Sequence, residues 1–279
     1  MATKNAVLNY EQQFYLDEPI RTGVLFYKSV SSLDGGYSID ESSVNIIGKG
    51  HTYPVARGPL VGNFRISKYY IGNEPLLNYT GDNAISGSIN YYNESKPNVK
   101  NFGFTSGYLT EYSVSAGIGR IPETRSSIVV YGDIGSGINA SGSNSHPKIE
   151  IPNQGSISLN ATGYQTNRVT DFTYTLRIDR SPVYKIGDPF PVQVDRTFPL
   201  TQEATFSLDV HDFEVNKIQE YLISPKQQTI NLEFKNPINS SKIESFTINK
   251  ARLLSQSIRS STNDVLKVQL RYIGYINKK

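Results

Sequence analysis

Two stretches of this chain repeat one another, and that repeat constrains the fold more than any other feature. Residues 30–58 align with residues 169–197 at a constant offset of 139, and nine of the 29 positions are identical. Ordinary composition would give roughly two identities. The identical pairs are Val30/Val169, Ile39/Ile178, Asp40/Asp179, Ser42/Ser181, Val44/Val183, Ile47/Ile186, Gly48/Gly187, Val55/Val194 and Arg57/Arg196. The sequence therefore predicts an internal duplication.

The match continues beyond this window with small changes of offset. Pro59-Leu60 matches Pro199-Leu200, Phe64–Ile66 matches Phe206–Leu208 at an offset of 142, and Leu109 matches Leu253 at an offset of 144. We expect one domain at residues 1–135 and a second at 164–279, with a Gly/Ser/Asn-rich linker or long loop at 136–163. Inside that segment, the alternation of Ile149–Ile151 and of Ile157–Leu159 predicts a small ribbon.

Strand patterns dominate both halves. Apolar and polar residues alternate with a period of two, as in a strand with one buried face. The segments are Phe64–Ile66, Ile89–Tyr91, Ile128–Tyr131, Phe172–Ile178, Phe206–Val210, Ile230–Phe234 and Val268–Tyr272. The fold class expected is mainly β: two tandem, similar β-sandwich or barrel domains, each with one α-helix. Asp34–Gly36 predicts a tight turn, because glycine accepts positive φ.

Each half also has one helical signal. His211–Leu222 carries apolar residues at spacings of three and four, with acidic residues in its first turn. Asn73–Tyr79 lies at the matching point of the first half, with Asn73 as the expected cap and Pro75 near the first helical position.

Composition excludes several kinds of site. The chain has no Cys and three His among 279 residues, so a disulfide scaffold, a Cys nucleophile and a Cys-ligated zinc site are excluded. The histidines, His51, His146 and His211, do not have metal-ligand spacing. A net charge of +3 does not by itself indicate nucleic-acid binding. No run of about 18 apolar residues predicts a membrane span.

Three further patterns favour structural roles over chemistry. Gly132–Gly137 lacks the Lys-Ser/Thr ending of a phosphate-binding loop. Asp209, Asp212 and Glu214 are explained by the electrostatics of a helix start. Asp40 and Asp179 could be the carboxylate pair of a glycosidase. Equivalent residues in two copies of a domain, however, normally have the same structural role in each copy. We therefore expect no enzyme activity, no catalytic, cofactor-binding or metal-binding residues, and no cofactor.

The pair Arg57/Arg196 is the repeated basic feature, placed before the Pro-Leu step of each half. A local ion pair or an exposed turn charge is the simple interpretation. The alternatives are a salt bridge between neighbouring subunits or contact with a polyanion.

The order of elements resembles the tube-forming proteins of bacteriophage tails and related injection machines. A strand, a Pro-Leu step, a strand, a single helix, further strands and a final Tyr-x-Gly strand follow one another, without a short diagnostic motif. The residues that carry the resemblance are Val169–Leu176, Pro199-Leu200, Phe206–Leu222, Ala251–Leu254 and Tyr272–Gly274, and in the first half Val55–Tyr79 and Phe102–Gly132.

The resemblance implies a structural virion protein. In this family six β-domains form a ring, strands line a channel for DNA and the tape-measure protein, and rings stack into a tube. Two domains per chain then imply trimers with pseudo-sixfold symmetry. Expected partners are the chain itself, the tape-measure protein and neighbouring tail proteins, with DNA only in transit and no membrane insertion. The expected location is the virion tail, after assembly in the host cytoplasm.

Three other functions stay open. A distal-tail, adaptor or baseplate ring would use similar domains. A receptor- or glycan-binding module would present Tyr-rich loops, although Trp is absent. A glycan-degrading enzyme would depend on Asp40 and Asp179.

Overall fold

The computed structural model describes residues 12–17, 25–27, 30–39, 41–45, 52–57, 59–70, 72, 74–93, 96–138, 157–161, 164–166, 169–209, 227–236, 238–239, 241–260 and 266–278. The protein is almost entirely β, and most strands belong to one large antiparallel sheet. The prediction of a mainly β fold is confirmed, and each alternating segment named above lies in or runs to the end of a strand.

The elements follow the same order in both halves. The first half contains β1 (Gln12–Asp17), β2 (Leu25–Tyr27), β3 (Val30–Ser38), β4 (Glu41–Asn45), β5 (Thr52–Arg57), β6 (Val61–Tyr69), the 3-10 helix η2 (Pro75–Tyr79), β7 (Ile85–Asn93), β8 (Lys96–Gly117), β9 (Glu123–Val130) and β10 (Ile134–Ser136). The second contains β11 (Ile157–Ala161), β12 (Tyr164–Thr166), β13 (Asp171–Arg177), β14 (Arg180–Val183), β15 (Gln193–Arg196), β16 (Leu200–Asp209), β17 (Gln228–Lys235), β18 (Lys242–Arg259) and β19 (Lys267–Ile276).

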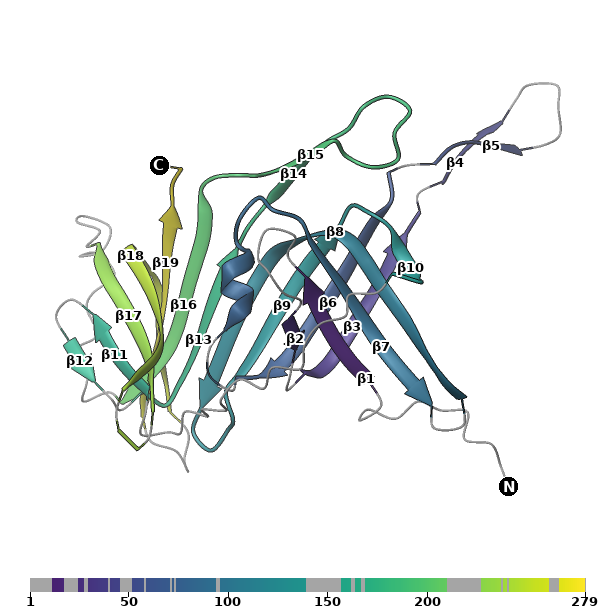
Figure 1. Cartoon of the computed structure of the whole chain (residues 1–279). Helices are drawn as coiled ribbons and strands as arrows, with labels where there is room; N and C mark the ends of the chain where they lie inside the picture. Colours follow the sequence, from purple (N-terminus) through teal and green to yellow (C-terminus); the bar gives the residue numbers. More distant parts are fainter. Residues whose placement is uncertain are drawn as a thin grey trace.

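Strand pairing repeats as well. In the first half the neighbours run β2-β1-β7-β8-β9-β6-β3, and in the second they run β12-β11-β17-β18-β19-β16-β13. Two separate hairpins, β4–β5 and β14–β15, follow β3 and β13 along the chain and so occupy equivalent places in the two halves. They extend from the same side of the molecule (Figure 1). The duplication read from the sequence therefore has a counterpart in topology.

The long strands β8 and β18 carry matching irregularities. Each contains a residue with a φ of 52°, Ser106 in β8 and Lys250 in β18, although a positive φ is uncommon outside glycine. Each also has a bulge a few residues later, after Leu109 and after Leu253. The offset is 144 at both features. Because a bulge bends a strand, each long strand can pass from one layer to another, pairing first with β7 or β17 and then with β9 or β19.

The two halves do not form separate sheets. Strand β13 pairs antiparallel with the second part of β8, from Asp171 opposite Gly117 to Arg177 opposite Glu111. We call this pairing the internal seam. It joins the two halves through backbone hydrogen bonds, so that one sheet runs β3-β6-β9-β8-β13-β16-β19-β18.

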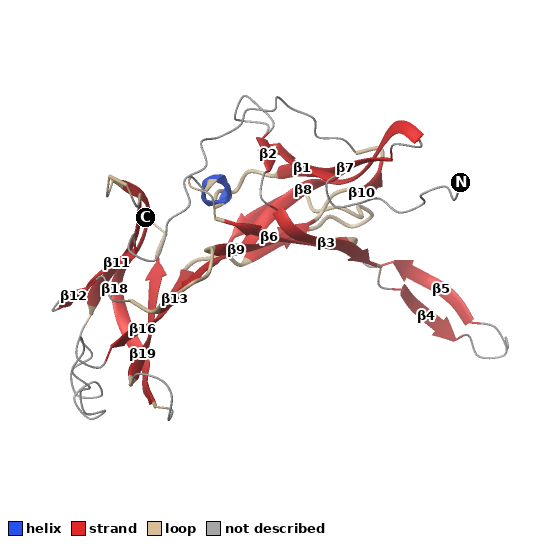
Figure 2. Ribbon diagram, turned by 90° about the horizontal axis from the view of Figure 1, so that it is seen from below, coloured by secondary structure: helices blue, strands red, loops and turns tan. Residues whose placement is uncertain are grey.

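This eight-strand sheet is arched. Figure 2 shows β3, β6, β9, β13, β16 and β19 following an arc, with β1, β2 and β7 outside one end and β11 and β12 outside the other. The helix η2 lies on the same outer side. The side chains that point outward from the arc are buried by this second layer, which gives a sandwich-like packing, and those that point inward form a concave face.

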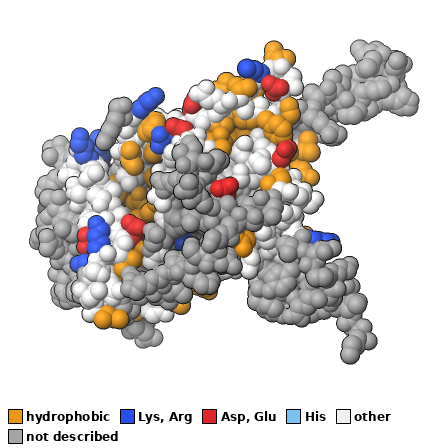
Figure 3. Space-filling model, viewed as in Figure 1, with side chains coloured by type: hydrophobic (Ala, Val, Ile, Leu, Met, Phe, Trp, Pro, Cys, Tyr) orange, Lys and Arg blue, Asp and Glu red, His pale blue; other side chains and the backbone are white. Residues whose placement is uncertain are grey.

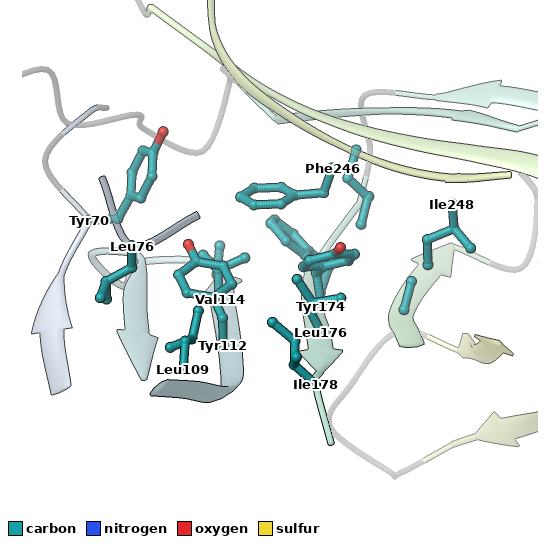
Figure 4. Packing of buried hydrophobic residues seen from close by; sticks show 14 of the residues in the cluster. Tyr70, Leu76, Leu109, Tyr112, Val114, Tyr174, Leu176, Ile178, Phe246 and Ile248 are labelled. Carbon is teal, nitrogen blue, oxygen red and sulfur yellow. The ribbon is translucent and has the colours of Figure 1, made fainter. Parts of the chain in front are cut away.

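One hydrophobic core fills the space between the layers and crosses the internal seam. Phe246 of β18 lies 6.4 Å from Tyr112 of β8 and 4.9 Å from Tyr174 of β13, measured between ring centroids (Figure 4). Phe234 of β17 similarly contacts Tyr70 and the rings of the second half. Aromatic rings from both halves thus hold the arch from its outer side.

The two helix predictions have different outcomes. In the first half, Pro75–Tyr79 forms the short 3-10 helix η2 and not an α-helix. Its cap is Glu74, whose carboxylate accepts a hydrogen bond from the Leu76 N–H at 3.2 Å; Asn73, the predicted cap, lies outside the described residues. The second Glu74 oxygen lies 2.9 Å from Lys68 Nζ, and both side chains are buried. The predicted helix His211–Leu222 lies outside the described residues.

Two details of the sequence comparison are corrected by strand register. Phe64 of β6 pairs with Ile128, and Ala204 of β16 pairs with Tyr272. Ile128 and Tyr272 are equivalent at the offset of 144 that relates the long strands. Phe64 therefore corresponds to Ala204, at an offset of 140, and not to Phe206, at an offset of 142. Asp34–Gly36 is no turn, since β3 continues through it. Gly35 is required there for another reason: a Cβ on it would approach the Phe64 ring to 2.5 Å.

The segment at 136–163 contains part of the sheet. Of the predicted ribbon, Ile157–Leu159 lies in strand β11, whose partners are β12 and β17; Ile149–Ile151 lies outside the described residues. Strand β11 occupies the position that β1 occupies on β7. Residues 139–156 lie outside the described part of the chain.

The buried pair of Lys68 and Glu74 gives a stability prediction. Glu74→Gln should lower the free energy of unfolding by about 3–5 kcal/mol, because it removes the negative charge that lies 2.9 Å from the buried Lys68 ammonium. Urea denaturation measures the change. Glu123→Gln removes an exposed partner of Arg125 and should cost less than about 1 kcal/mol. Equal losses in the two variants would contradict this interpretation of the buried pair.

Tyr112 gives a prediction about pH. Burial, followed by the charge of Glu74, raises the pKa of Tyr112 well above its usual value, and its hydroxyl is buried with no hydrogen-bond partner in the described structure. The folded state keeps this proton while the unfolded state loses it near pH 10, so stability is constant below that pH and falls above it. Tyr112→Phe should therefore leave stability at pH 7 within about 1 kcal/mol and reduce the loss at pH 10–11. Denaturation at several pH values tests this, with the exposed Tyr275→Phe as control; an unchanged alkaline loss in Tyr112→Phe would contradict it.

Candidate assembly surface

The residues considered for chemistry lie largely outside the described part of the chain. His51, His146, His211, Asp40, Asp212 and Glu214 lie outside the described residues. The backbone carbonyl of Asp179 accepts a hydrogen bond from the Thr197 N–H at 2.9 Å. Gly132–Gly137 contains strand β10, which pairs with β8, and the Gly137 N–H donates to Asn101. These contacts shape strands and turns.

Within the described part of the chain, no three His, Cys, Asp or Glu side chains gather as metal ligands would. Nor does that part include a helix with the length and apolar character needed to cross a bilayer.

Arg196 connects the two halves. Its guanidinium makes a two-pronged contact with Asp82, with Nε 2.7 Å from Oδ1 and Nη2 3.1 Å from Oδ2. It also donates to the carbonyl of Thr80 at 3.1 Å. Arg196 is therefore in an ion pair, but with a residue of the other half and not with the local partner that the sequence predicted. The side chain of Arg57 is outside the description.

Arg180 is the seam residue that the repeat comparison missed. Its side chain is buried, and it donates to the Leu109 carbonyl at 3.0 and 3.1 Å and to the Gly81 carbonyl at 2.8 Å. Leu109 precedes the bulge of β8. Burial lowers the pKa of Arg180 to about 10, although the nearby Asp82 opposes this shift.

A comparison of identical residues could not have found Arg180, because its counterpart at the offset of 139 is Glu41. The two copies differ at this position although they share the hairpin. In sequence the only signal is that reversal of charge.

The concave face of the eight-strand sheet is polar and carries charges of both signs in nearly equal number. Alternation of burial along the paired strands places six acidic and seven basic side chains on it. The charged residues are Asp34, Glu111, Glu123, Asp171, Glu203, Asp209, Arg65, Arg125, Arg177, Arg252, Arg259, Lys267 and Arg271. Small hydroxyl residues fill many of the other positions, such as Ser113 and Ser115 on β8 and Thr173 and Thr175 on β13.

Charges on the concave face pair across strands. Glu203 lies 2.8 Å from Arg271 of β19 and 3.9 Å from Arg177 of β13, and Arg177 lies 3.8 Å from Glu111 of β8. The face is hollowed near one end of the internal seam, where a cavity of about 510 Å³ is lined by residues as distant in sequence as Arg125 and Arg259. On the opposite, helix-bearing side, Figure 3 shows described charges of both signs without a patch of either.

The eight-strand sheet ends in two open edges. Among described residues, β3 pairs only with β6, and residues 252–259 of β18 pair only with β19. An open edge presents unpaired backbone N–H and C=O groups, which can take another strand. The concave face and its two edges are therefore the candidate functional surface, and they suit assembly rather than bond chemistry.

The seam contacts give a further prediction. Arg180→Met should lower the free energy of unfolding by about 3 kcal/mol, because the Leu109 and Gly81 carbonyls lose a buried charged donor. Arg177→Met, on the adjacent strand but exposed, should cost less than about 1 kcal/mol. Chemical denaturation compares them. If the two variants unfold alike, Arg180 does not fix the seam.

No protein-family model matches the sequence, and no curated protein matches it.

Proposed function

We propose that this chain is a structural virion protein that forms the rings of a bacteriophage tail tube. One observation carries the proposal: two copies of one strand order stand side by side in a single arched sheet, and the same two kinds of edge stay open at its ends. A contact between unlike edges can repeat from chain to chain, and it closes into a ring when the rotation permits.

In this proposal each chain provides two similar β-domains, 1–135 and 164–279, each with one helix, and three chains provide six places around the ring. The arch supports closure, because every added chain continues the curvature with its concave face inward (Figure 2). The second layer and η2 would then form the outer wall.

The concave face suits the lining of a channel. A surface that binds DNA tightly concentrates Lys and Arg against the phosphates. Here six acidic residues offset all but one of seven basic ones, and several of them are paired with each other. Such a lining gives a passing polyanion little net attraction, which favours transit over binding. In the virion tail, the tape-measure protein would occupy this channel before DNA.

Other rings of the same tail are the second candidate, since a distal-tail, adaptor or baseplate ring would use the same edges. Stacking separates the two roles: a tube protein stacks ring upon ring into long particles, whereas an adaptor stops at one or two layers.

Native mass spectrometry of the purified protein tests the ring. The expected smallest assembly is three chains, because each chain fills two of six places in one ring. Six chains per ring would show that the two halves do not occupy equivalent places. A monomer at micromolar concentration that binds glycans on an array would contradict the proposal and favour a receptor-binding module.

A further inference from the structure

We propose that, in the ring, β18 of one chain pairs antiparallel with β3 of the next chain in the register of the internal seam. The inference rests on the proposed ring function and specifies its contact, residue by residue. We call this contact the chain-to-chain seam.

The internal seam supplies the template. Residues 111–117 of β8 correspond to residues 255–261 of the second half, since the positive φ and the bulge of the two strands match at an offset of 144. Strand β13 corresponds to β3, since their pairings with β16 and β6 match at offsets of 139 and 140. The two strands that pair at the internal seam are thus the counterparts of the two open edges.

These offsets fix a register. At the internal seam Ser113 lies opposite Thr175 and Glu111 lies opposite Arg177. The corresponding positions of the chain-to-chain seam place Ser257 opposite Gly36, and Ser255 opposite Ser38, of the next chain. A shift by one residue would turn the core-facing side chains toward the channel, so the alternation of the strands also restrains this register.

Unusual exposure at both edges supports the pairing. Tyr37 of β3 and Ile258 of β18 belong to the core-facing side of the sheet, since they lie beside Gly62 and Val268. They are nevertheless 55% and 53% exposed. Their counterparts at the internal seam, Leu176 and Val114, are 5% and 0% exposed. A strand on each edge would cover these apolar side chains as the internal seam covers theirs.

Charge is complementary as well. The same register places Arg259 of β18 opposite Asp34 of the next chain's β3, whereas the internal seam has Ser115 opposite Thr173 there. Opposite charges facing one another across an antiparallel pair are favourable. Pairing of two β18 edges has no such complement, because β18 ends in Arg259 and presents no acid in residues 252–259.

Engineered disulfides test the register cleanly, because the chain has no Cys. Gly36→Cys with Ser257→Cys, and Ser38→Cys with Ser255→Cys, are the two pairs in register. Both edges accept the substitutions: a Cβ on Gly36 meets nothing within 4 Å, and the three serines are exposed. Directly opposed residues of antiparallel strands have the Cα separation that a disulfide needs.

Under mild oxidation both in-register pairs should link chains into dimers and trimers that reductant dissolves on a gel. The two crossed combinations, Gly36→Cys with Ser255→Cys and Ser38→Cys with Ser257→Cys, are displaced by two residues along the strand and should link several-fold less. Ser113→Cys with Thr175→Cys is the positive control, since it should close a disulfide within one chain and leave the oligomer unchanged.

The outcomes separate the inference from the function it rests on. If the reduced variants form trimers by native mass spectrometry but the crossed combinations link better, the register is overturned and the ring stands. Crosslinking by Ser257→Cys alone or Gly36→Cys alone would show like edges in contact and overturn the chain-to-chain seam. Absence of any oligomer in the unmodified protein would overturn the ring itself.

Discussion

The pairing of β13 with β8 is the contact on which the architecture depends. It joins the two halves by a backbone ladder from Asp171/Gly117 to Arg177/Glu111, so they form one sheet instead of two. Phe246 packs over Tyr112 and Tyr174 on its outer side, and Arg180 holds the Leu109 carbonyl beside the bulge. Ladder, core and buried guanidinium together fix how one half meets the other, and hence the arch.

The seam also explains why the two copies have diverged. A tandem pair has one internal contact and two outer edges, and each position now faces a different neighbour. Arg180 reaches Gly81 and Asp82 of the first half, but its counterpart is Glu41, which cannot donate to a carbonyl. Arg196 likewise meets Asp82 of the first half. The identical residues therefore report the shared fold, and the differing ones report the two kinds of seam.

The strands could be predicted from the sequence because apolar and polar residues alternate along a half-buried strand. The repeat could be found because residues 30–58 and 169–197, which contain the hairpins, have the same length in the two halves. The sequence comparison misplaced Phe64 against Phe206 by two residues, an error that strand periodicity hides because both alignments keep apolar residues on one face. Gly35 was taken for a turn residue, since sequence cannot show that the Phe64 ring lies over it. Arg180 gave no repeat signal, and the two open edges of the eight-strand sheet became visible only from the strand pairing of the folded chain.

In the proposed ring, the contact inside one chain is repeated between successive chains until the arch closes. Top-view averages of the purified assembly by electron microscopy test it most directly. The chain-to-chain seam predicts a ring around an open hole, with threefold symmetry and six similar wall segments, two from each chain. Particles without a hole, or a ring of six complete chains with strict sixfold symmetry, would contradict it.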